Sequence, residues 1–276
     1  MTQLKTLAIG LGLLASTSFA NASPKPVGLA NLEIRHEGAD TLKNVEDWIV
    51  SFITSVAPPG RKVYYPEGQE TEEEALARYH SIAKDIIAVV YSPSTSPLFK
   101  GDDGRSRTIS VILSIMFHES SFMKHVDYGL GKYAKGDGGK SWCMMQLKIG
   151  DGHTLKWNRV HDRPIAWNDP SSEVFEGYTG EELIADRKVC IREGLKILRL
   201  SFGGTQGLPL LDRLRVYASG KRDQGEDASH NRMRTAINWF ARSFHGQFTD
   251  AEVMRALREE HPETAPVGPA ATHTST

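Results

Sequence analysis

The carboxyl group of Glu119 belongs to a pattern that predicts burial. The pattern recurs at steps of three and four residues, which is the spacing of one helical face. Its members are Thr108, Val111, Ile112, Ile115, Met116, Glu119, Phe122 and Met123. A carboxylate that loses hydration tends to keep its proton, and an acid that keeps its proton near neutral pH is suited to general acid catalysis. The alternative is that Glu119 lies at the edge of this face, where it reaches water or pairs with an arginine or lysine.

Helical spacing predicts further helices on both sides of the one that carries Glu119. That helix is expected over 107–124. The others are expected over 41–56, 70–91, 181–202, 210–218, 229–243 and 250–260. Thr71, followed by Glu73 and Glu74, is expected to open the second of these helices. No strand pair and no internal repeat stands out, so the predicted fold class is mainly α.

Two segments after Glu119 lack a regular pattern. Residues 128–139 hold five glycines, which makes them too flexible for regular structure and long enough to line a cleft. From 147 to 179 the chain is also expected to stay irregular. Trp157 and Trp167 lie in this stretch, and their rings are candidates for cleft walls or, equally, for plugs on the surface of the core.

The two ends of the chain have the composition of processing and linker segments. Residues 1–22 have the features of a secretory signal, with Lys5, an apolar run and a small-residue cleavage site. Residues 23–40 indicate a linker, and 261–276 are expected to form a disordered tail. The mature protein is therefore expected to be periplasmic or secreted, with no stable membrane insertion.

Charge argues against a nucleic acid as the partner. The formal net charge is −1, and removal of Lys5 with the signal would make it −2. Binding to nucleic acid draws most of its affinity from neutralised phosphates, which a near-neutral chain does not favour. The arginine-rich stretch from 213 to 242 is interpreted as a solvated helical surface.

Cys143 and Cys190 are the only cysteines. In an exported protein an even pair predicts a disulfide, which here would close a loop of about 48 residues and stabilise the fold by roughly 3 to 4 kcal/mol in the chain-entropy model. A catalytic thiol is the competing interpretation. The residues around Cys143 do not match a cysteine-protease signature, which favours the disulfide.

No metal and no organic cofactor is predicted. His118 and Glu119 begin like a zinc-protease helix, but Phe122 stands where the second histidine ligand would be. The Gly-Asp runs at 101–104 and 136–139 lack the ligand spacing of a calcium loop.

Four short pieces of sequence occur in a characteristic order. They read His-Glu-Ser-Ser-Phe at 118–122, Cys-Met-Met-Gln-Leu at 143–147, Cys-Ile-Arg-Glu-Gly-Leu-Lys-Ile-Leu at 190–198 and Val-Tyr-Ala-Ser-Gly at 216–220. This order resembles the SLT-type lytic transglycosylases of the lysozyme superfamily. Their pattern runs Glu-Ser-x-Phe, Gly-Leu-Met-Gln, a glycine-bearing helix ending in Leu, and Ala-Tyr-Asn-Ala-Gly.

The resemblance implies a mainly α, lysozyme-like catalytic domain over 105–260, of the kind seen in goose-type lysozyme. It places Glu119 at the catalytic acid, and it implies substrate-binding roles for Ser120, Met145, Gln146 and Tyr217. Two positions depart from the family pattern. A cysteine at 143 replaces a glycine, which suggests that a disulfide has replaced a tight backbone approach, and an alanine at 218 replaces an asparagine.

The implied reaction is cleavage of the β-1,4 bond between MurNAc and GlcNAc in peptidoglycan strands. In this family one glutamate acts as acid and then as base, and the product carries a 1,6-anhydro end. A lysozyme-type hydrolase, either muramidase or chitinolytic, would need a second carboxylate about 5 to 10 Å away. Asp127, Asp137 and Asp151 are the candidates, although each is more simply an exposed turn acid.

A third possibility is a catalytically inactive glycan-binding or scaffold protein on the same fold. The predicted helices between 41 and 104 match no known motif. They are expected either to pack on the domain at 105–260 or to recruit another protein of the cell envelope.

Overall fold

The computed structural model describes residues 37–150, 152, 154, 157–158, 163–164, 174–175 and 177–260. All of these belong to one compact unit that begins at His36. The predicted signal at 1–22, most of the predicted linker at 23–40 and the predicted tail at 261–276 lie outside the described residues. Asp151 and Trp167 also lie outside them, and the side chain of Trp157 is not described.

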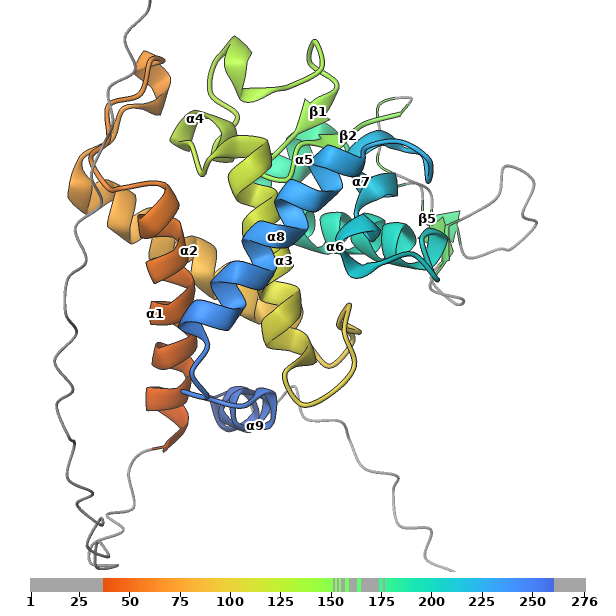
Figure 1. The fold of residues 1–276 in the computed structure, drawn as a ribbon. Helices are drawn as coiled ribbons and strands as arrows, with labels where there is room; N and C mark the ends of the chain where they lie inside the picture. Colours follow the sequence, from red (N-terminus) through yellow and green to blue (C-terminus); the bar gives the residue numbers. More distant parts are fainter. Residues whose placement is uncertain are drawn as a thin grey trace, which may run out of the picture. The chain divides into compact units, whose positions relative to one another are not determined.

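Helices make up most of the described chain (Figure 1). The α-helices are α1 (Glu37–Val56), α2 (Glu72–Val90), α3 (Gly104–Ser120), α4 (Lys124–Asp127), α5 (Gly180–Ala185), α6 (Arg187–Gly204), α7 (Arg215–Ser219), α8 (Glu226–Ser243) and α9 (Asp250–Glu260). Three short 3₁₀ helices are η1 (Pro66–Gly68), η2 (Lys132–Ala134) and η3 (Leu210–Asp212). The mainly α prediction is confirmed.

Local signals in the sequence fix the start of α2 as predicted. The Thr71 hydroxyl accepts the backbone N–H of Glu74 at 3.1 Å, and the Glu74 carboxylate accepts the N–H of Thr71 at 2.9 Å. This reciprocal pair is a capping box, and it satisfies two backbone donors that the first turn leaves without partners. The helix predicted over 250–260 is also present, as α9.

Helices α1 and α8 begin earlier than predicted, at Glu37 and Glu226, so the last residues of the predicted linker at 23–40 are helical instead. Three other predicted helices end early or are divided. The helix predicted over 107–124 ends at Ser120, because the next two residues turn into the left-handed region. The one predicted over 181–202 is broken at Asp186, whose carboxylate accepts the N–H of Lys188 at 2.8 Å and so starts α6. The one predicted over 210–218 divides into η3 and α7.

The expectation of no strand pairs is wrong. Two-residue strands β1 (Ser141–Trp142) and β2 (Leu147–Lys148) pair antiparallel. In the stretch predicted to be irregular, β3 (Trp157–Asn158) pairs antiparallel with both β4 (Arg163–Pro164) and β5 (Val174–Phe175). Strands of two residues are too short to produce a detectable alternation of polar and apolar residues.

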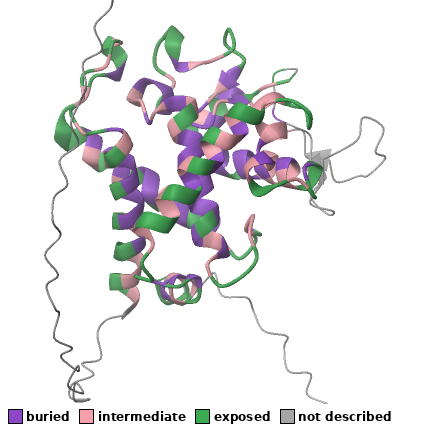
Figure 2. Ribbon diagram, in the orientation of Figure 1, coloured by how far each residue is buried: buried purple, intermediate pink, exposed green. Residues whose placement is uncertain are grey.

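Helix α3 is the centre of the core. It packs against α1, α2, α8 and α9, and α8 crosses in front of it (Figures 1 and 2). Ile109, Ile112 and Leu113 are fully buried, and so are the small polar side chains of Ser106 and Ser114. A helix buried on most sides does not need a single apolar stripe, since every face meets another helix.

The first helices pack directly on the rest of the unit. Trp48 of α1 meets the rings of Phe240, Phe244 and Phe248 at centroid distances of 5.7 to 6.5 Å. These edge-to-face contacts join the start of the unit to its last helices. Within the described residues, no helix combines the length and apolar character that a membrane span requires.

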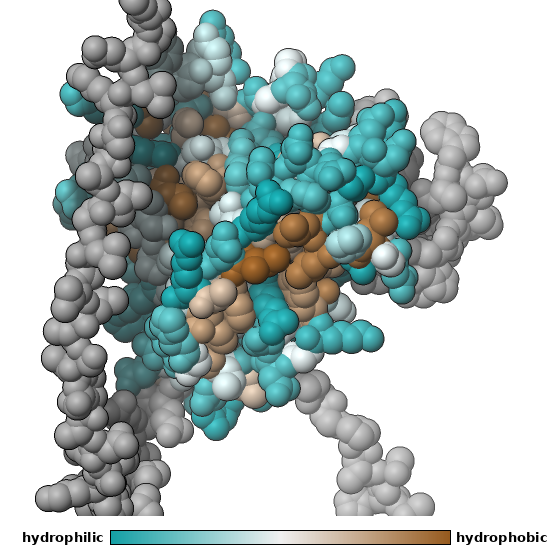
Figure 3. Space-filling model, viewed as in Figure 1, coloured by the Kyte–Doolittle hydropathy of each residue, from teal (hydrophilic) through white to brown (hydrophobic). Residues whose placement is uncertain are grey.

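Apolar side chains also gather on the outer surface around α8 (Figure 3). They surround a cavity of about 280 Å³ between α3, α8 and η3. The lining includes Val111, Met233, Ile237 and Phe240. Val111 lies about two helical turns before Glu119, and none of the predicted site residues lines this cavity.

Candidate active site

Glu119 lies in the last turn of α3 and forms an ion pair. Arg232 of α8 donates from Nη2 and from Nε to Glu119 Oε1, at 2.6 and 3.0 Å. The two side chains are 20% and 15% exposed. Of the two sequence-based alternatives for Glu119, the structure has the partly exposed carboxylate paired with an arginine. Among the hydrogen bonds of the described residues, both from Arg232 fall on Oε1, so Oε2 is available to another group.

Arg232 also corrects the interpretation of the arginine-rich stretch as a solvated surface. Its guanidinium is largely shielded by Glu119 and by the carbonyl of Ala228, to which Nη1 donates at 3.1 Å. The neighbouring imidazole of His118 is affected too: burial lowers the pKa of His118, and the positive charge of Arg232 lowers it further. The site therefore contains a cation that sequence spacing did not indicate, because 113 residues separate it from its partner.

The turn that follows Glu119 is strained and firmly held. Ser121 and Phe122 have φ angles of 50° and 52°, in the left-handed region that residues with a Cβ seldom adopt. Arg61 donates to the carbonyl of Ser121, and Arg78 Nη2 donates to the carbonyl of Phe122 at 2.9 Å. These long-range donors stabilise a backbone that the local sequence does not favour, and they end the helix earlier than predicted.

Ser120 closes the end of α3. Its hydroxyl donates to the carbonyl of Met116 at 2.7 Å and accepts the N–H of Phe122 at 3.3 Å, and the residue is 5% exposed. Phe122 is fully buried and meets Phe52 edge to face. The hydroxyl of Ser120 is therefore engaged with backbone and turned inward, which gives it a role in shaping the turn.

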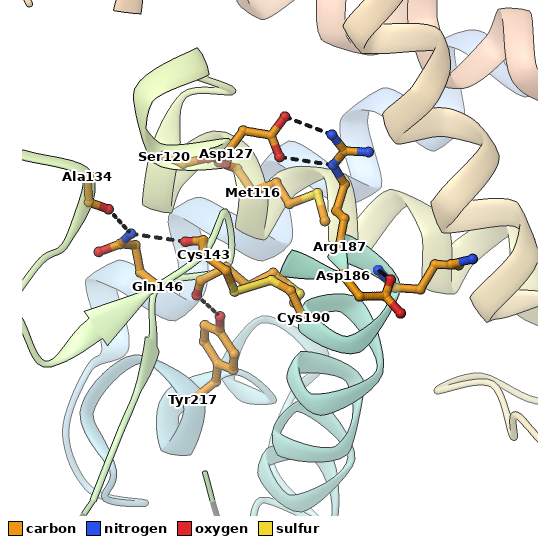
Figure 4. The surroundings of a disulfide bond; sticks show 12 residues. Met116, Ser120, Asp127, Ala134, Cys143, Gln146, Asp186, Arg187, Cys190 and Tyr217 are labelled. Carbon is orange, nitrogen blue, oxygen red and sulfur yellow. Dashed lines mark hydrogen bonds and ion pairs between the residues drawn. A yellow bond between two sulfur atoms is a disulfide. The ribbon is translucent and has the colours of Figure 1, made fainter. Parts of the chain in front are cut away.

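Asp127 is part of a buried ion network. Arg187 donates to its two oxygens at 2.9 Å each, from Nε and Nη2 (Figure 4), and Arg78 Nη1 lies 3.6 Å away. Burial works to lower the pKa of Arg187, but the hydrogen bonds and negative charges of Asp127 and Asp85 outweigh it and raise that pKa. The interpretation of Asp127 as an exposed turn acid is wrong. Because both of its oxygens accept hydrogen bonds from Arg187 and its side chain is 2% exposed, Asp127 is also unsuited to serve as a nucleophile or base.

The other candidate second carboxylates contribute little. Asp137 is exposed in a turn with a φ of 49° and accepts a hydrogen bond from Ser141 Oγ at 2.9 Å. This is the exposed turn acid that the sequence favoured. Asp151 lies outside the described residues. Among the described candidates, neither Asp127 nor Asp137 is a free carboxylate in a shielded position.

Tyr217 lies beside the Glu119–Arg232 pair. Burial raises the pKa of its phenol well above the ordinary value, and the negative charge of Glu119 raises it further against the opposing charge of Arg232. The Tyr217 hydroxyl donates to the carbonyl of Met145 at 2.7 Å (Figure 4). The tyrosine thus feels the charge of Glu119 and is bonded to the turn that carries Gln146.

Gln146 is held in that turn with an unusual backbone. Its φ is 47°, and Nε2 donates to the carbonyls of Cys143 and Ala134, at 3.0 and 3.5 Å (Figure 4). The predicted disulfide is confirmed: Cys143 is bonded to Cys190 of α6, with the Cα atoms 6.3 Å apart. The competing interpretation of Cys143 as a catalytic thiol is wrong, because both sulfur atoms are part of the disulfide.

Met145 lies beneath this turn and is fully buried. A Cβ at Gly194 of α6 would lie 2.2 Å from Met145 Sδ, so the glycine leaves room for the Met145 side chain in its present position. Two of the four sequence pieces, at 143–147 and 190–198, therefore meet through this glycine and the disulfide. The Met145 side chain supports the turn from inside, and its carbonyl is the acceptor for Tyr217.

A second charged cluster lies behind Tyr217. Asp212, Glu226 and His230 bring carboxylate and imidazole atoms within 4.8 Å of one another. Arg215, two residues before Tyr217, donates to Asp212 and to Glu226 at 2.7 Å each. Burial works to raise the pKa of Asp212, but hydrogen bonds from Arg215 and His230 outweigh it and lower that pKa. Since these oxygens already accept from a guanidinium, the cluster fits an ion-pair network better than a metal site.

The structure brings some of the predicted site residues together in one region. Glu119 and Tyr217 are neighbours, and Tyr217 contacts the Met145–Gln146 turn.

Comparison with known proteins gives no match: no family model matches the chain, and neither does any curated protein or solved structure. The arginines at 61, 78 and 232 are the site residues that sequence reasoning missed.

Proposed function

We propose that this protein is a lytic transglycosylase that cleaves the MurNAc-GlcNAc β-1,4 bond of peptidoglycan, with Glu119 as its acid and base. The observation that carries the proposal is that Tyr217 lies within the electrostatic influence of Glu119 and donates to the carbonyl of Met145 in the Met145–Gln146 turn, which brings three of the four sequence pieces into one region. The fourth piece supports that turn through Gly194 and the disulfide. A mainly α organisation is compatible with the lysozyme-like domain that this function implies.

The proposed reaction has two steps. In the first, the Glu119 carboxyl gives its proton to the glycosidic oxygen, the bond from C1 of MurNAc to that oxygen breaks, and the 2-acetamido carbonyl oxygen bonds to C1. In the second, the 6-hydroxyl of the same sugar bonds to C1 and displaces that carbonyl oxygen. Its proton passes to the Glu119 carboxylate. No water is consumed, and no second carboxylate is required.

Arg232 pairs with Glu119 and stabilises its carboxylate form, which is the base of the second step. The guanidinium stabilises the carboxylate that remains after the proton has left, and Oε2 is the oxygen from which the proton would be given. Tyr217 positions the turn through its bond to the Met145 carbonyl. The Gln146 amide oxygen, whose own N–H₂ group is used on backbone carbonyls, is an acceptor for sugar hydroxyl or amide groups.

The deciding experiment compares Glu119→Gln with the unmutated protein on isolated peptidoglycan sacculi. We expect the variant to lose at least about a hundredfold in cleavage rate, since the general acid is removed. Mass spectrometry of the unmutated protein's products is expected to find 1,6-anhydromuramyl ends. The control is Glu73→Gln, which alters an exposed glutamate in the first turn of α2. Equal cleavage by all three proteins would remove the proposal.

The ion pair itself favours one other function. A carboxylate already bonded to Arg232 is also what a non-catalytic glycan-binding or scaffold protein could retain for structural reasons. Binding of sacculi without any product would support that function. Products with reducing ends would instead identify a hydrolase of the lysozyme type.

The location and partners of the enzyme follow from the same proposal. Its substrate lies in the bacterial cell envelope, which agrees with a secretory signal at 1–22 and a periplasmic or secreted protein. The packing of Trp48 on the last helices gives the predicted segment at 41–104 a structural role in the unit. An envelope partner for that segment stays a prediction.

A further inference from the structure

Three tyrosines form an exposed aromatic surface that the proposed chemistry does not use. Tyr64 is 90% exposed and Tyr133 is 51% exposed. Between them, Tyr65 stacks on Tyr133 with ring centroids 4.3 Å apart and meets Tyr64 edge to face at 5.2 Å. We call these three rings the tyrosine shelf. Aromatic rings this exposed are unusual on a monomer and mark surfaces that bind something.

The shelf is held in place by the structure beneath it. Tyr65 also meets the ring of His125, which is 2% exposed, at a centroid distance of 5.0 Å. Lys132 Nζ lies 4.7 Å from the centroid of the Tyr133 ring. Tyr64 and Tyr65 come just before η1 and Tyr133 lies in η2, so residues far apart in sequence converge on one surface. Rings fixed in this way lose little conformational entropy when a ligand binds.

The shelf and the turn that carries Gln146 are linked by one segment of the chain. Tyr133 precedes Ala134, and the Ala134 carbonyl accepts the hydrogen bond from Gln146 Nε2 (Figure 4). The glycine-rich stretch at 128–139 therefore carries the shelf on one side and braces Gln146 on the other.

The chemistry of the shelf fits sugar rings. Aromatic faces stack on the C–H faces of pyranose rings, while the phenol hydroxyls and the Lys132 ammonium offer hydrogen bonds to hydroxyl and acetamido groups. We propose that the tyrosine shelf is an additional binding site for a β-1,4-linked amino-sugar strand, several sugars away from the bond cleaved at Glu119. This inference rests on the proposed function for the identity of its ligand, and it adds a site outside the four sequence pieces.

The first test measures binding without cleavage. The full mature protein carrying Glu119→Gln is sedimented with peptidoglycan sacculi, alone and with Tyr64→Ala or with Tyr64→Ala and Tyr133→Ala together. We expect the double change to weaken binding about tenfold, in line with the energy of aromatic stacking contacts. The matched control is Tyr128→Ala, which removes an exposed tyrosine outside the shelf. Tyr64→Ala alone keeps the test valid if the double variant does not fold, since Tyr64 is almost fully exposed.

The second test measures turnover with Glu119 intact. The shelf variants are expected to raise KM on sacculi about tenfold while kcat stays unchanged, and to leave cleavage of a short soluble muropeptide tetrasaccharide unaffected. Binding to sacculi by the shelf variants equal to that of Tyr128→Ala would overturn the inference, as would a failure of the Glu119→Gln parent to bind sacculi. If Glu119→Gln still cleaves while the shelf variants lose binding, the proposed catalytic role fails and the shelf stands.

Discussion

Two ion-pair networks support the candidate active site, and they differ in exposure. Behind Glu119, Arg78 and Asp127 have side chains 3% and 2% exposed and lie within one buried network with Glu70 and Arg187. Behind Tyr217, Arg215 joins Asp212 to Glu226, whose side chain is 58% exposed. The first network holds the strained turn after the acid, and the second holds the short helix that carries the tyrosine.

The difference teaches which side of the site is rigid. A buried charge that loses its partner has no water to replace it, so removing one member of the buried network is expensive. When an exposed ion pair is broken, water hydrates the separated charges. Salt also screens the attraction between the two charges of an exposed pair. We infer that Glu119 is held at a fixed position, whereas Tyr217 can adjust when a sugar strand enters.

The largest expected effect is that of Arg78→Met. The change leaves Glu70 without its two hydrogen bonds from Arg78 and frees the carbonyl of Phe122. Loss of one partner from a buried pair is expected to lower the free energy of unfolding by about 3 to 5 kcal/mol, and Tm by roughly 10 °C. Thermal unfolding followed by circular dichroism measures it.

The control for that experiment is Lys43→Met, which breaks an exposed pair with Asp47 one helical turn away. Its Tm is expected to stay close to that of the unmutated protein. Similar losses in the two variants would mean that burial does not distinguish the networks, and the comparison would fail.

The features that could be predicted from the sequence depend on residue type and short spacing. The features that could not be predicted depend on contacts between residues far apart in the chain. The capping box at Thr71 and Glu74 lies within four residues, and its pattern was readable. The disulfide was readable from an even pair of cysteines in a chain with a secretory signal. Each of these signals depends on residue type and short spacing alone.

The end of α3 could not be predicted, because the donors that stabilise the left-handed Ser121 and Phe122 come from positions 61 and 78. The partner of Glu119 was hidden for the same reason, since Arg232 lies 113 residues away in an arginine-rich stretch. In this site the catalytic candidate was visible in the sequence, whereas the groups that position it and set its charge depend on the fold.

A smaller effect is expected from the burial of the His125 imidazole beside the first network. Burial lowers the pKa of His125 from its ordinary value of 6.5, against the opposing charge of Glu67. Below pH 6.5 the unfolded chain therefore binds a proton at this position that the folded chain does not, and the free energy of unfolding falls as pH drops through this window. Above that pH the contribution is fully present.

Urea unfolding at pH 7 and pH 5 measures this dependence. His125→Gln is expected to lose less stability between these two pH values than the unmutated protein, whatever its absolute stability. Some dependence will persist, because the pKa of His118 is lowered in the same sense. The control is His245→Gln, at an exposed position. A slope in His125→Gln as steep as in this control would show that His125 is not shielded from water.

The smallest expected effect is that of Glu226→Gln, which alters the exposed member of the second network, and salt is what separates it from the buried network. At low ionic strength the variant is expected to unfold at a slightly lower temperature than the unmutated protein, since Arg215 loses its ion pair with a side chain that is 58% exposed. In about 1 M NaCl the screening length falls to about 3 Å, so this difference is expected to vanish. The deficit of Arg78→Met should persist there, because ions do not reach a side chain that is 3% exposed. A deficit of Glu226→Gln that survives high salt would mean that Tyr217 is held as rigidly as Glu119, and the site would then have no adjustable side.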